Sequence, residues 1–183
     1  MHLEGITLAP TPGWLQEKLF ERRIVFVTGR LDDALAAQAA SQIVMLDAAG
    51  DEPIDVVLGS ADGTLEAAFV LIDVLDAAHA TVRVHCQGRV AGPAVGVAAA
   101  ADQRSAATHT TFRLSLPPAQ LAGTADQIAA QSEQHRLLVW RFQARLAKAT
   151  GRPVEDVADD MRRTRYLDAR EALDYGLIDA IKS

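Results

Sequence analysis

Residues 87–96 read QGRVAGPAVG and lie between the run ATVRVHC (80–86) and the small-residue run VAAAAD (97–102). The β-branched run before this stretch is typical of a strand, and the small residues after it are compatible with a tightly packed helix. The glycine-flanked stretch therefore predicts a strand, a tight turn and a helix. Pro93 would occupy the first turn of that helix, where the N–H that proline lacks would have no partner in any case.

The first half of the chain alternates between short apolar runs and longer helical patterns. Three β-branched runs end in Gly or Ser, as buried strands do: 23–29, 54–60 and 81–88. Residues 32–49 and 64–78 place apolar side chains at helical spacing. Those stripes consist of Leu35, Ala39, Ile43 and Leu46, and of Leu65, Phe69, Ile72 and Leu75. Strand, crossover helix and strand in succession predict an α/β fold with a largely parallel sheet.

A single long helical pattern occupies residues 125–150 and ends at Gly151. Its continuous face consists of Ile128, Ser132, His135, Val139, Phe142, Leu146 and Ala149. A helix of about 25 residues is roughly 37 Å long, which exceeds what the core of a small domain needs. Because its first half is also polar, we expect it to project beyond its own subunit and pack on another chain. The alternative is a long helix that lies across the sheet.

The C-terminal segment carries clear helix signals. A short helix follows Pro153. Asp168 and Glu171 form a capping box for the next helix, Gly176 ends it, and a strand-like stretch, LIDAI, follows at 177–181.

Composition limits the possible function classes. The chain has 183 residues, of which 49% are hydrophobic, and this predicts one domain with a substantial core. A net charge of −6, with no basic cluster beyond MRRTR (161–165), argues against a nucleic-acid partner. Cys86 is the only cysteine, which favours a reducing compartment. No leader pattern opens the sequence and no apolar run approaches the roughly 18 residues of a membrane span, so we expect a soluble, cytoplasmic protein with no membrane partner.

Several blocks resemble the proteolytic subunit of the Clp protease (ClpP) in order and spacing. They are ERRIVFVTGRLDD, the loop LGSADGT, QGRVAGPAVGVAAAA, the long helix, and ATGRPVEDVADDMRRTRYLDAREALDYGLID. The resemblance covers about residues 14–181. It implies a ClpP/crotonase-type spiral of ββα units with a projecting handle helix. We expect an N-terminal arm at 1–13 and one domain at 14–183, with a handle region at about 113–150.

The resemblance implies a Ser-His-Asp triad, yet each of its positions holds another residue. The family's serine, in its Gly-x-x-x-Ser-Met-Gly turn, falls at Gly92 when counted from Gly88. The family's histidine, two residues before a proline, falls at Ser115 after a short deletion near 103. The family's aspartate, two residues before an aromatic residue, falls at Thr164. The nucleophile, the base and the residue that orients the base are therefore all replaced.

The implied oxyanion site is altered as well. One donor is the N–H of the residue after the serine, which here is Pro93, and proline has no N–H. The other donor falls at Asp62, whose carboxylate would repel a second negative charge. An oxyanion donor contributes roughly 3–4 kcal/mol in well-studied hydrolases. The loss of these donors is independent of the loss of the triad, because the two sets of groups have different roles.

A relocated active site is the first alternative. The available serines are Ser60, Ser105, Ser115 and Ser132, and the available histidines are His85, His109 and His135. Nothing in their spacing predicts a nucleophile, a base and fresh oxyanion donors together. His85 and Cys86 are neighbours in a strand and point to opposite faces, so we predict neither a metal site nor a cofactor.

The main hypothesis is a catalytically silent ClpP-type subunit without peptidase activity. The resemblance implies heptameric or tetradecameric rings with active paralogues and an AAA+ unfoldase. It also implies a ring-pairing strand near 113–124, which Pro117 and Pro118 would weaken. Two other hypotheses are a crotonase-type acyl-thioester enzyme or binder, which also needs N–H donors near Asp62 and Pro93, and a stand-alone scaffold.

Overall fold

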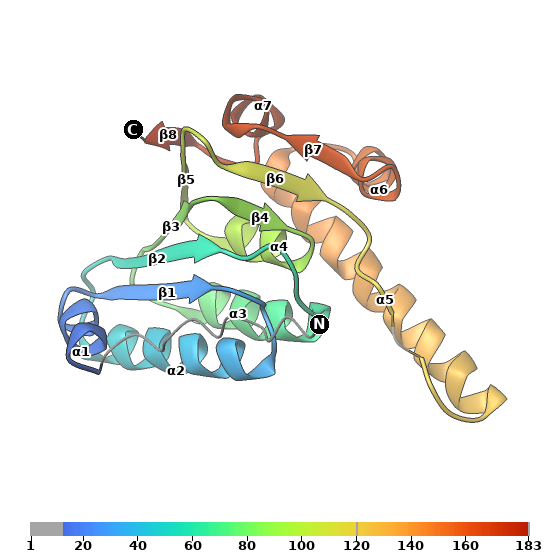
Figure 1. The fold of residues 1–183 in the computed structure, drawn as a ribbon, viewed down its shortest axis with the longest axis horizontal. Coiled ribbons are helices and arrows are strands. Elements are labelled where there is room, and N and C mark those ends of the chain that lie inside the picture. Colours follow the sequence, from blue (N-terminus) through green and yellow to red (C-terminus); the bar gives the residue numbers. More distant parts are fainter. Residues whose placement is uncertain (1–12, 120, 183) are drawn as a thin grey trace, which may run out of the picture.

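A five-stranded parallel sheet forms the centre of the fold (Figure 1). The computed structural model describes residues 13–119 and 121–182. The strand order is β1-β2-β3-β5-β8, and every neighbouring pair is parallel. The strands are β1 (Ile24–Thr28), β2 (Ile54–Gly59), β3 (Val82–Cys86), β5 (Gln103–Ala107) and β8 (Ala180–Lys182). The predicted α/β fold with a parallel sheet is therefore confirmed.

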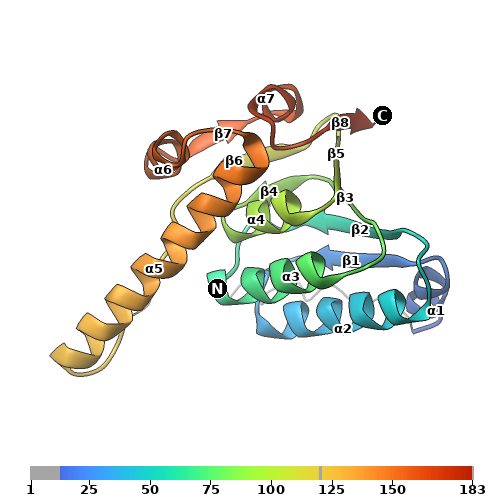
Figure 2. The same ribbon diagram turned by 180° about the vertical axis from the view of Figure 1, so that it is seen from behind.

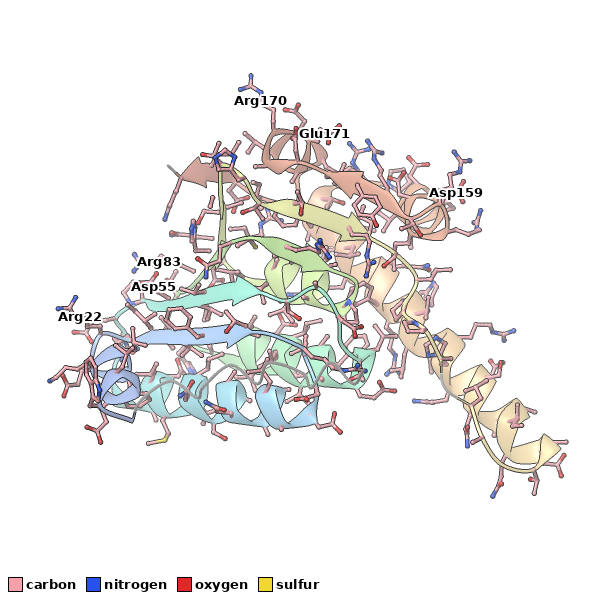
Figure 3. All side chains as sticks on the ribbon, viewed as in Figure 1. Arg22, Asp55, Arg83, Asp159, Arg170 and Glu171 are labelled. Carbon is pink, nitrogen blue, oxygen red and sulfur yellow. The ribbon has the colours of Figure 1, made fainter. Side chains whose placement is uncertain are left out.

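Three helices cover one face of this sheet (Figure 2). They are α2 (Asp33–Ala49), α3 (Leu65–Ala77) and α4 (Pro93–Ala100), while α1 (Gly13–Glu21) precedes β1. The side chains of Asp32 and Thr64 cap α2 and α3 by accepting hydrogen bonds from backbone N–H groups in the first turn. Alternate strand residues such as Val56 and Val84 face the helices and are buried. The opposite face carries Asp55 and Arg83, side by side on β2 and β3 in Figure 3.

A second, smaller sheet positions the turn at Gly92. It contains β4 (Arg89–Ala91), β6 (Thr111–Leu114) and β7 (Arg165–Leu167), in the order β4-β6-β7. β4 is parallel to β6, and β6 is antiparallel to β7. Sequence patterns did not predict this sheet, because its strands are only three or four residues long.

The long helix α5 (Ala125–Thr150) extends away from the rest of the chain (Figures 1 and 2). Its buried residues are Phe142 and Leu146, both in its second half, whereas Ile128 and Trp140 are exposed. The expectation of a projecting handle helix is therefore confirmed, and the helix does not lie across the sheet.

The ring-pairing strand expected near 113–124 would pair with a second copy of the chain, so it stays a prediction, and only its first residues belong to a strand of this chain. β6 ends at Leu114, and the chain from 115 to 119 and from 121 to 124 contains no strand. Pro117 and Pro118 cannot donate to a ladder. Instead, the side-chain amide of Gln131 on α5 accepts from Ala122 N (3.2 Å) and donates to Ala122 O (3.1 Å).

The C-terminal elements follow the predicted signals. They are α6 (Val154–Arg162), β7 and α7 (Ala169–Tyr175). The capping box of Asp168 and Glu171 is present, and Gly176 ends α7 in the left-handed conformation. The strand predicted at 177–181 is shorter in the structure, where β8 spans Ala180–Lys182. Leu177 and Ile178 precede it and are buried in the core.

Arg104 on β5 joins the ends of three C-terminal elements. Its Nη1 donates to the carbonyls of Ala149 and Gly176, each at 3.1 Å. Its Nε and Nη2 donate to the Asp179 carboxylate at 3.2 and 2.5 Å. The last turn of α5, the end of α7 and the approach to β8 are thus held by one side chain.

Among the described residues, no helix is long and apolar enough to cross a bilayer.

Candidate functional site

The turn between β4 and α4 has an unusual backbone shape at Gly92. Its φ of 55° and ψ of −126° lie outside the regions that L side chains adopt without strain. A sharp, strained strand-to-helix turn of this kind is the geometry that exposes a nucleophile in other hydrolases. Pro93 begins α4, as the sequence predicted. The turn therefore has the shape of a nucleophile-bearing turn without a side chain to serve as the nucleophile.

All five predicted site positions line one cavity of about 250 Å³ beside this turn. The lining residues are Asp62, Gly92, Pro93, Arg113, Ser115, Leu116, Pro117, Pro118 and Thr164. A Cβ atom placed on Gly92 would lie 3.9 Å from the Ser115 hydroxyl oxygen. The fold thus brings together the loop after β2, the turn between β4 and α4, the segment after β6 and the turn before β7, which are far apart in sequence.

The chemistry of this cavity differs from that of a serine peptidase. Among the described residues that line it, none has an imidazole. The hydroxyls of Ser115 and Thr164 are too weakly basic to take a proton from a nucleophile near neutral pH. Pro93 supplies no N–H at the start of α4.

The Asp62 carboxylate is hydrogen-bonded and paired with neighbouring groups. Its Oδ1 accepts from the Gly63 N–H at 2.8 Å, and its Oδ2 lies 3.2 Å from the Arg30 guanidinium. The backbone carbonyl of Asp62 accepts from Ser60 Oγ at 2.9 Å and from Leu31 N at 2.9 Å. The loop that would supply the second oxyanion donor is therefore ordered around a negatively charged side chain.

Thr164 has a left-handed backbone with φ of 55°. This conformation is a real outlier for a β-branched residue, whereas Asn and Asp adopt it several-fold more often. The position that lines the cavity therefore has a backbone suited to an aspartate-like residue, and the threonine there carries conformational strain.

Replacing Thr164→Asn will raise the free energy of unfolding by about 1 kcal/mol, because Asn tolerates the left-handed region better. The melting temperature of a chain of this size should rise by about 2–4 °C. Thr111→Asn is the matched control, since Thr111 is equally exposed but lies in a regular strand, where Asn is disfavoured. A fall in stability for Thr164→Asn would contradict the strain argument.

A serine–imidazole contact lies outside this cavity, between His85 and Ser105. His85 Nδ1 lies 3.1 Å from Ser105 Oγ, and the two residues are register partners in the parallel ladder of β3 and β5. Ser105 is only 7% exposed, and its hydroxyl also lies 3.4 Å from the Val84 carbonyl. Burial, and after it the positive charge of Lys182, lower the pKa of His85.

This pair lacks the other parts of a hydrolytic site. Backbone amides around it belong to a continuous parallel sheet, so they are not directed at a shared point as oxyanion donors must be. Neither His85 nor Ser105 lines the cavity at Gly92. The contact is therefore explained as a cross-strand hydrogen bond that satisfies a buried hydroxyl.

The remaining candidate serines and histidines lie apart from one another. Ser60 is fully buried, and Ser132 is exposed on the projecting half of α5. His109 lies in the exposed turn between β5 and β6. His135 lines a larger neighbouring cavity of about 410 Å³, which no serine lines.

The neighbours His85 and Cys86 point to opposite faces, as expected for a strand. Cys86 is buried, and this burial raises the pKa of its thiol to about 12. Within residues 13–119 and 121–182, no group of three or more His, Cys, Asp or Glu side chains is arranged to hold a metal ion.

Arg113 is the site residue that sequence reasoning missed. It precedes Ser115 by two positions on β6, so both side chains point to the same face and both line the cavity. That alternation was readable from the sequence. The burial of the guanidinium was not, because it depends on the loop around Ala61, whose carbonyl accepts from Arg113 Nη2 at 3.3 Å.

Comparison with known proteins agrees with this geometry. The sequence model of the family described as Clp protease matches residues 14–183. The "ATP-dependent Clp protease proteolytic subunit 3" of Rhodococcus jostii (strain RHA1) is 34% identical over 173 residues, which cover 92% of this chain and 85% of that protein. The "ATP-dependent Clp protease proteolytic subunit" of Paracoccus denitrificans is 34% identical over 159 residues, which cover 86% and 80%. Subunit 3 of Rhizobium etli is 33% identical over 168 residues, which cover 91% and 87%.

Proposed function

Because the chain belongs to the Clp protease family, we propose that it serves a Clp protease assembly as a non-catalytic subunit with a structural or regulatory role. One observation carries this proposal. The cavity at the strand-to-helix turn gathers all five positions where the family resemblance requires catalytic groups, and these positions hold Gly92, Pro93, Ser115, Thr164 and Asp62.

The losses act on different steps of peptide hydrolysis. Without a nucleophile and a base no acyl-enzyme can form, and without a donor at position 93 the charge on a tetrahedral intermediate is less stabilised. Restoring any one group leaves the other losses in place. The proposal therefore does not depend on a single substitution.

The relatives suggest the setting in which such a subunit acts. They bear the name of proteolytic subunits of an ATP-dependent Clp protease. We propose that this chain occupies positions in a heptameric or tetradecameric ring beside active ClpP-type paralogues, in the cytoplasm, and that an AAA+ unfoldase serves the ring. The exposed apolar residues of α5, namely Ile128, Leu137 and Trp140, support a role of this helix in contacts with other subunits.

The chain alone should hydrolyse no fluorogenic peptide, and a serine-directed phosphonate should label none of its serines. In a complex with an active paralogue, all labelling should lie on the paralogue. Ser105→Ala is the control for a relocated site. Labelling of the purified chain that this substitution abolishes would show that the His85 and Ser105 pair is catalytic and would overturn the proposal.

Native mass spectrometry of the same preparations tests the assembly. The proposal expects particles of seven or fourteen subunits, either of this chain or of this chain mixed with the paralogue. Trimers or paired trimers would contradict it and would favour the crotonase-type alternative.

A further inference from the structure

The cavity at the strand-to-helix turn contains a guanidinium, that of Arg113, which pairs with no carboxylate among residues 13–119 and 121–182. We propose that this cavity binds a carboxylate, which is held by the Arg113 guanidinium and by the hydroxyls of Ser115 and Thr164. This inference rests on the proposed function, since it takes the altered site as a binding site.

The environment of Arg113 is the main observation. Its side chain is half-buried, its Nη2 donates to the Ala61 carbonyl, and its Nε is buried without a hydrogen-bond partner. In the part of the chain that the structure describes, no carboxylate oxygen lies within 4.0 Å of it and its Nη1 makes no hydrogen bond. Half-buried Arg104 and Arg145, by contrast, are each held by an aspartate. A partly desolvated cation is costly unless it is paired, so Arg113 is suited to receiving an anion.

The surroundings of Arg113 favour an anion that accepts hydrogen bonds. Ser115 and Thr164 line the same cavity, and neither hydroxyl donates a hydrogen bond among the described residues. The first turn of α4 also faces the cavity through Pro93 and has no side-chain cap. The positive end of the α4 dipole therefore adds to the positive charge of Arg113.

Asp62 is the acidic residue that lines the cavity in the described part of the chain. Both of its carboxylate oxygens already have partners, with Oδ1 accepting from the Gly63 N–H and Oδ2 beside Arg30. Arg30 lines the neighbouring larger cavity, so the Asp62 carboxylate is paired on the side of that cavity. Arg30 therefore offsets part of the Asp62 charge, and among the described residues Arg113 is the cation of this cavity that has no carboxylate beside it.

A carboxylate matches these donors in shape as well as charge. The guanidinium fork and a carboxylate form parallel hydrogen bonds, and the buried Pro93 and Pro117 give the cavity an apolar wall beside them. The larger cavity of about 410 Å³ shares Asp62, Pro117 and Pro118 with this one and offers room for the rest of a peptide. The carboxylate can come from a peptide C-terminus or from an Asp or Glu side chain.

Fluorescence anisotropy with the full chain tests the proposal. The probes are a fluorescein-labelled hexapeptide of Ala and Leu with a free C-terminus, its C-terminal amide, and an amidated version with one Glu. The free acid should bind about ten-fold to a hundred-fold more tightly than the plain amide. Tight binding of the Glu-containing amide would assign the site to side-chain carboxylates, and weak binding would assign it to C-termini.

Variants of Arg113 link the effect to this cavity. Arg113→Met should abolish the preference for a carboxylate, and Arg113→Lys should keep part of it because the charge remains but the fork is lost. Arg89→Met is the matched control, since Arg89 lies on the adjacent strand β4 and is exposed. If Arg113→Met does not fold, the thermal shift of the wild-type chain with the acid and with the amide makes the same comparison.

Three outcomes would overturn the proposal. The first is equal affinity for all three probes, and the second is no binding of any probe at millimolar concentration. The third is an Arg113→Met variant that still prefers the carboxylate probe as strongly as the wild type does. Mass spectrometry of the peptides after incubation keeps this test separate from that of the proposed function. Cleaved peptide would disprove catalytic silence, whereas intact peptide with no carboxylate preference would disprove only the binding site.

Discussion

The triple variant Gly92→Ser, Ser115→His and Thr164→Asp will remain almost inactive against a fluorogenic peptide, and adding Pro93→Met will raise kcat/KM by about 100-fold or more. The reason is that one oxyanion donor contributes about 10²–10³ in rate, and Pro93 cannot supply that N–H. Gly92 already has the backbone shape of a nucleophile-bearing turn, and the other two positions line the same cavity.

The controls for this experiment separate the oxyanion donor from the triad. Pro93→Met alone should give no activity, because the chain then has a donor but no nucleophile. A serine at position 92 would adopt a strained backbone, which costs of order 1–3 kcal/mol, so each variant must be shown to be folded by circular dichroism. Robust turnover by the triple variant with Pro93 retained would refute the role assigned to this proline.

Arg104→Ala will lower the free energy of unfolding by about 3 kcal/mol and the melting temperature by about 6–12 °C. The substitution removes hydrogen bonds to two backbone carbonyls and to the Asp179 carboxylate, and it leaves those acceptors without their partner. The Arg104 side chain is only 15% exposed, so water cannot fully replace these bonds. Thermal and urea denaturation would measure the loss.

Arg83→Ala is the matched control for Arg104→Ala. Arg83 makes two hydrogen bonds of 2.7 Å to the Asp55 carboxylate, but the two side chains are 40% and 42% exposed. A solvent-exposed pair contributes about 0–1 kcal/mol, so this variant should be nearly as stable as the wild type. Equal losses for the two variants would show that the contacts of Arg104 to the carbonyls add nothing.

The effect of Arg104 also depends on pH. Burial alone would raise the pKa of Asp179, but the hydrogen bonds from the side chain and backbone of Arg104 outweigh burial and lower the pKa from its ordinary value of 3.8. A lowered folded-state pKa contributes stability that is present above the ordinary value and is lost as the pH falls through the lowered one. The difference in the free energy of unfolding between wild type and Arg104→Ala should therefore become smaller as the pH falls below 3.8.

Much of the fold was predictable because the relevant signals are local. The runs that became β1, β2 and β3 are bounded by turn residues, and the helices α2 and α5 begin and end within a residue or two of the predicted limits. The short strands of the second sheet were not predictable, since three residues carry no periodicity. The hydrogen bonds between the Gln131 side chain and the Ala122 backbone were not predictable either, since they join residues nine positions apart.

The positions that form the site were predictable from the sequence, but their backbone conformation and burial were not. The family resemblance located Gly92, Ser115 and Thr164, and the fold places them in one cavity. The left-handed backbone at Thr164 and the partly buried guanidinium of Arg113 depend on tertiary contacts, so no sequence pattern signals them.

The packing of Gly96 against Phe142 has a mechanical consequence. A Cβ on Gly96 would overlap the Phe142 ring, so α4 and α5 meet without a gap at this point. Phe142 lies at the base of the projecting half of α5, and Gly96 lies one turn beyond the start of α4. A side chain larger than hydrogen at position 96 would therefore push α5 away from α4, and α5 cannot tilt toward α4 at Phe142 unless α4 moves with it.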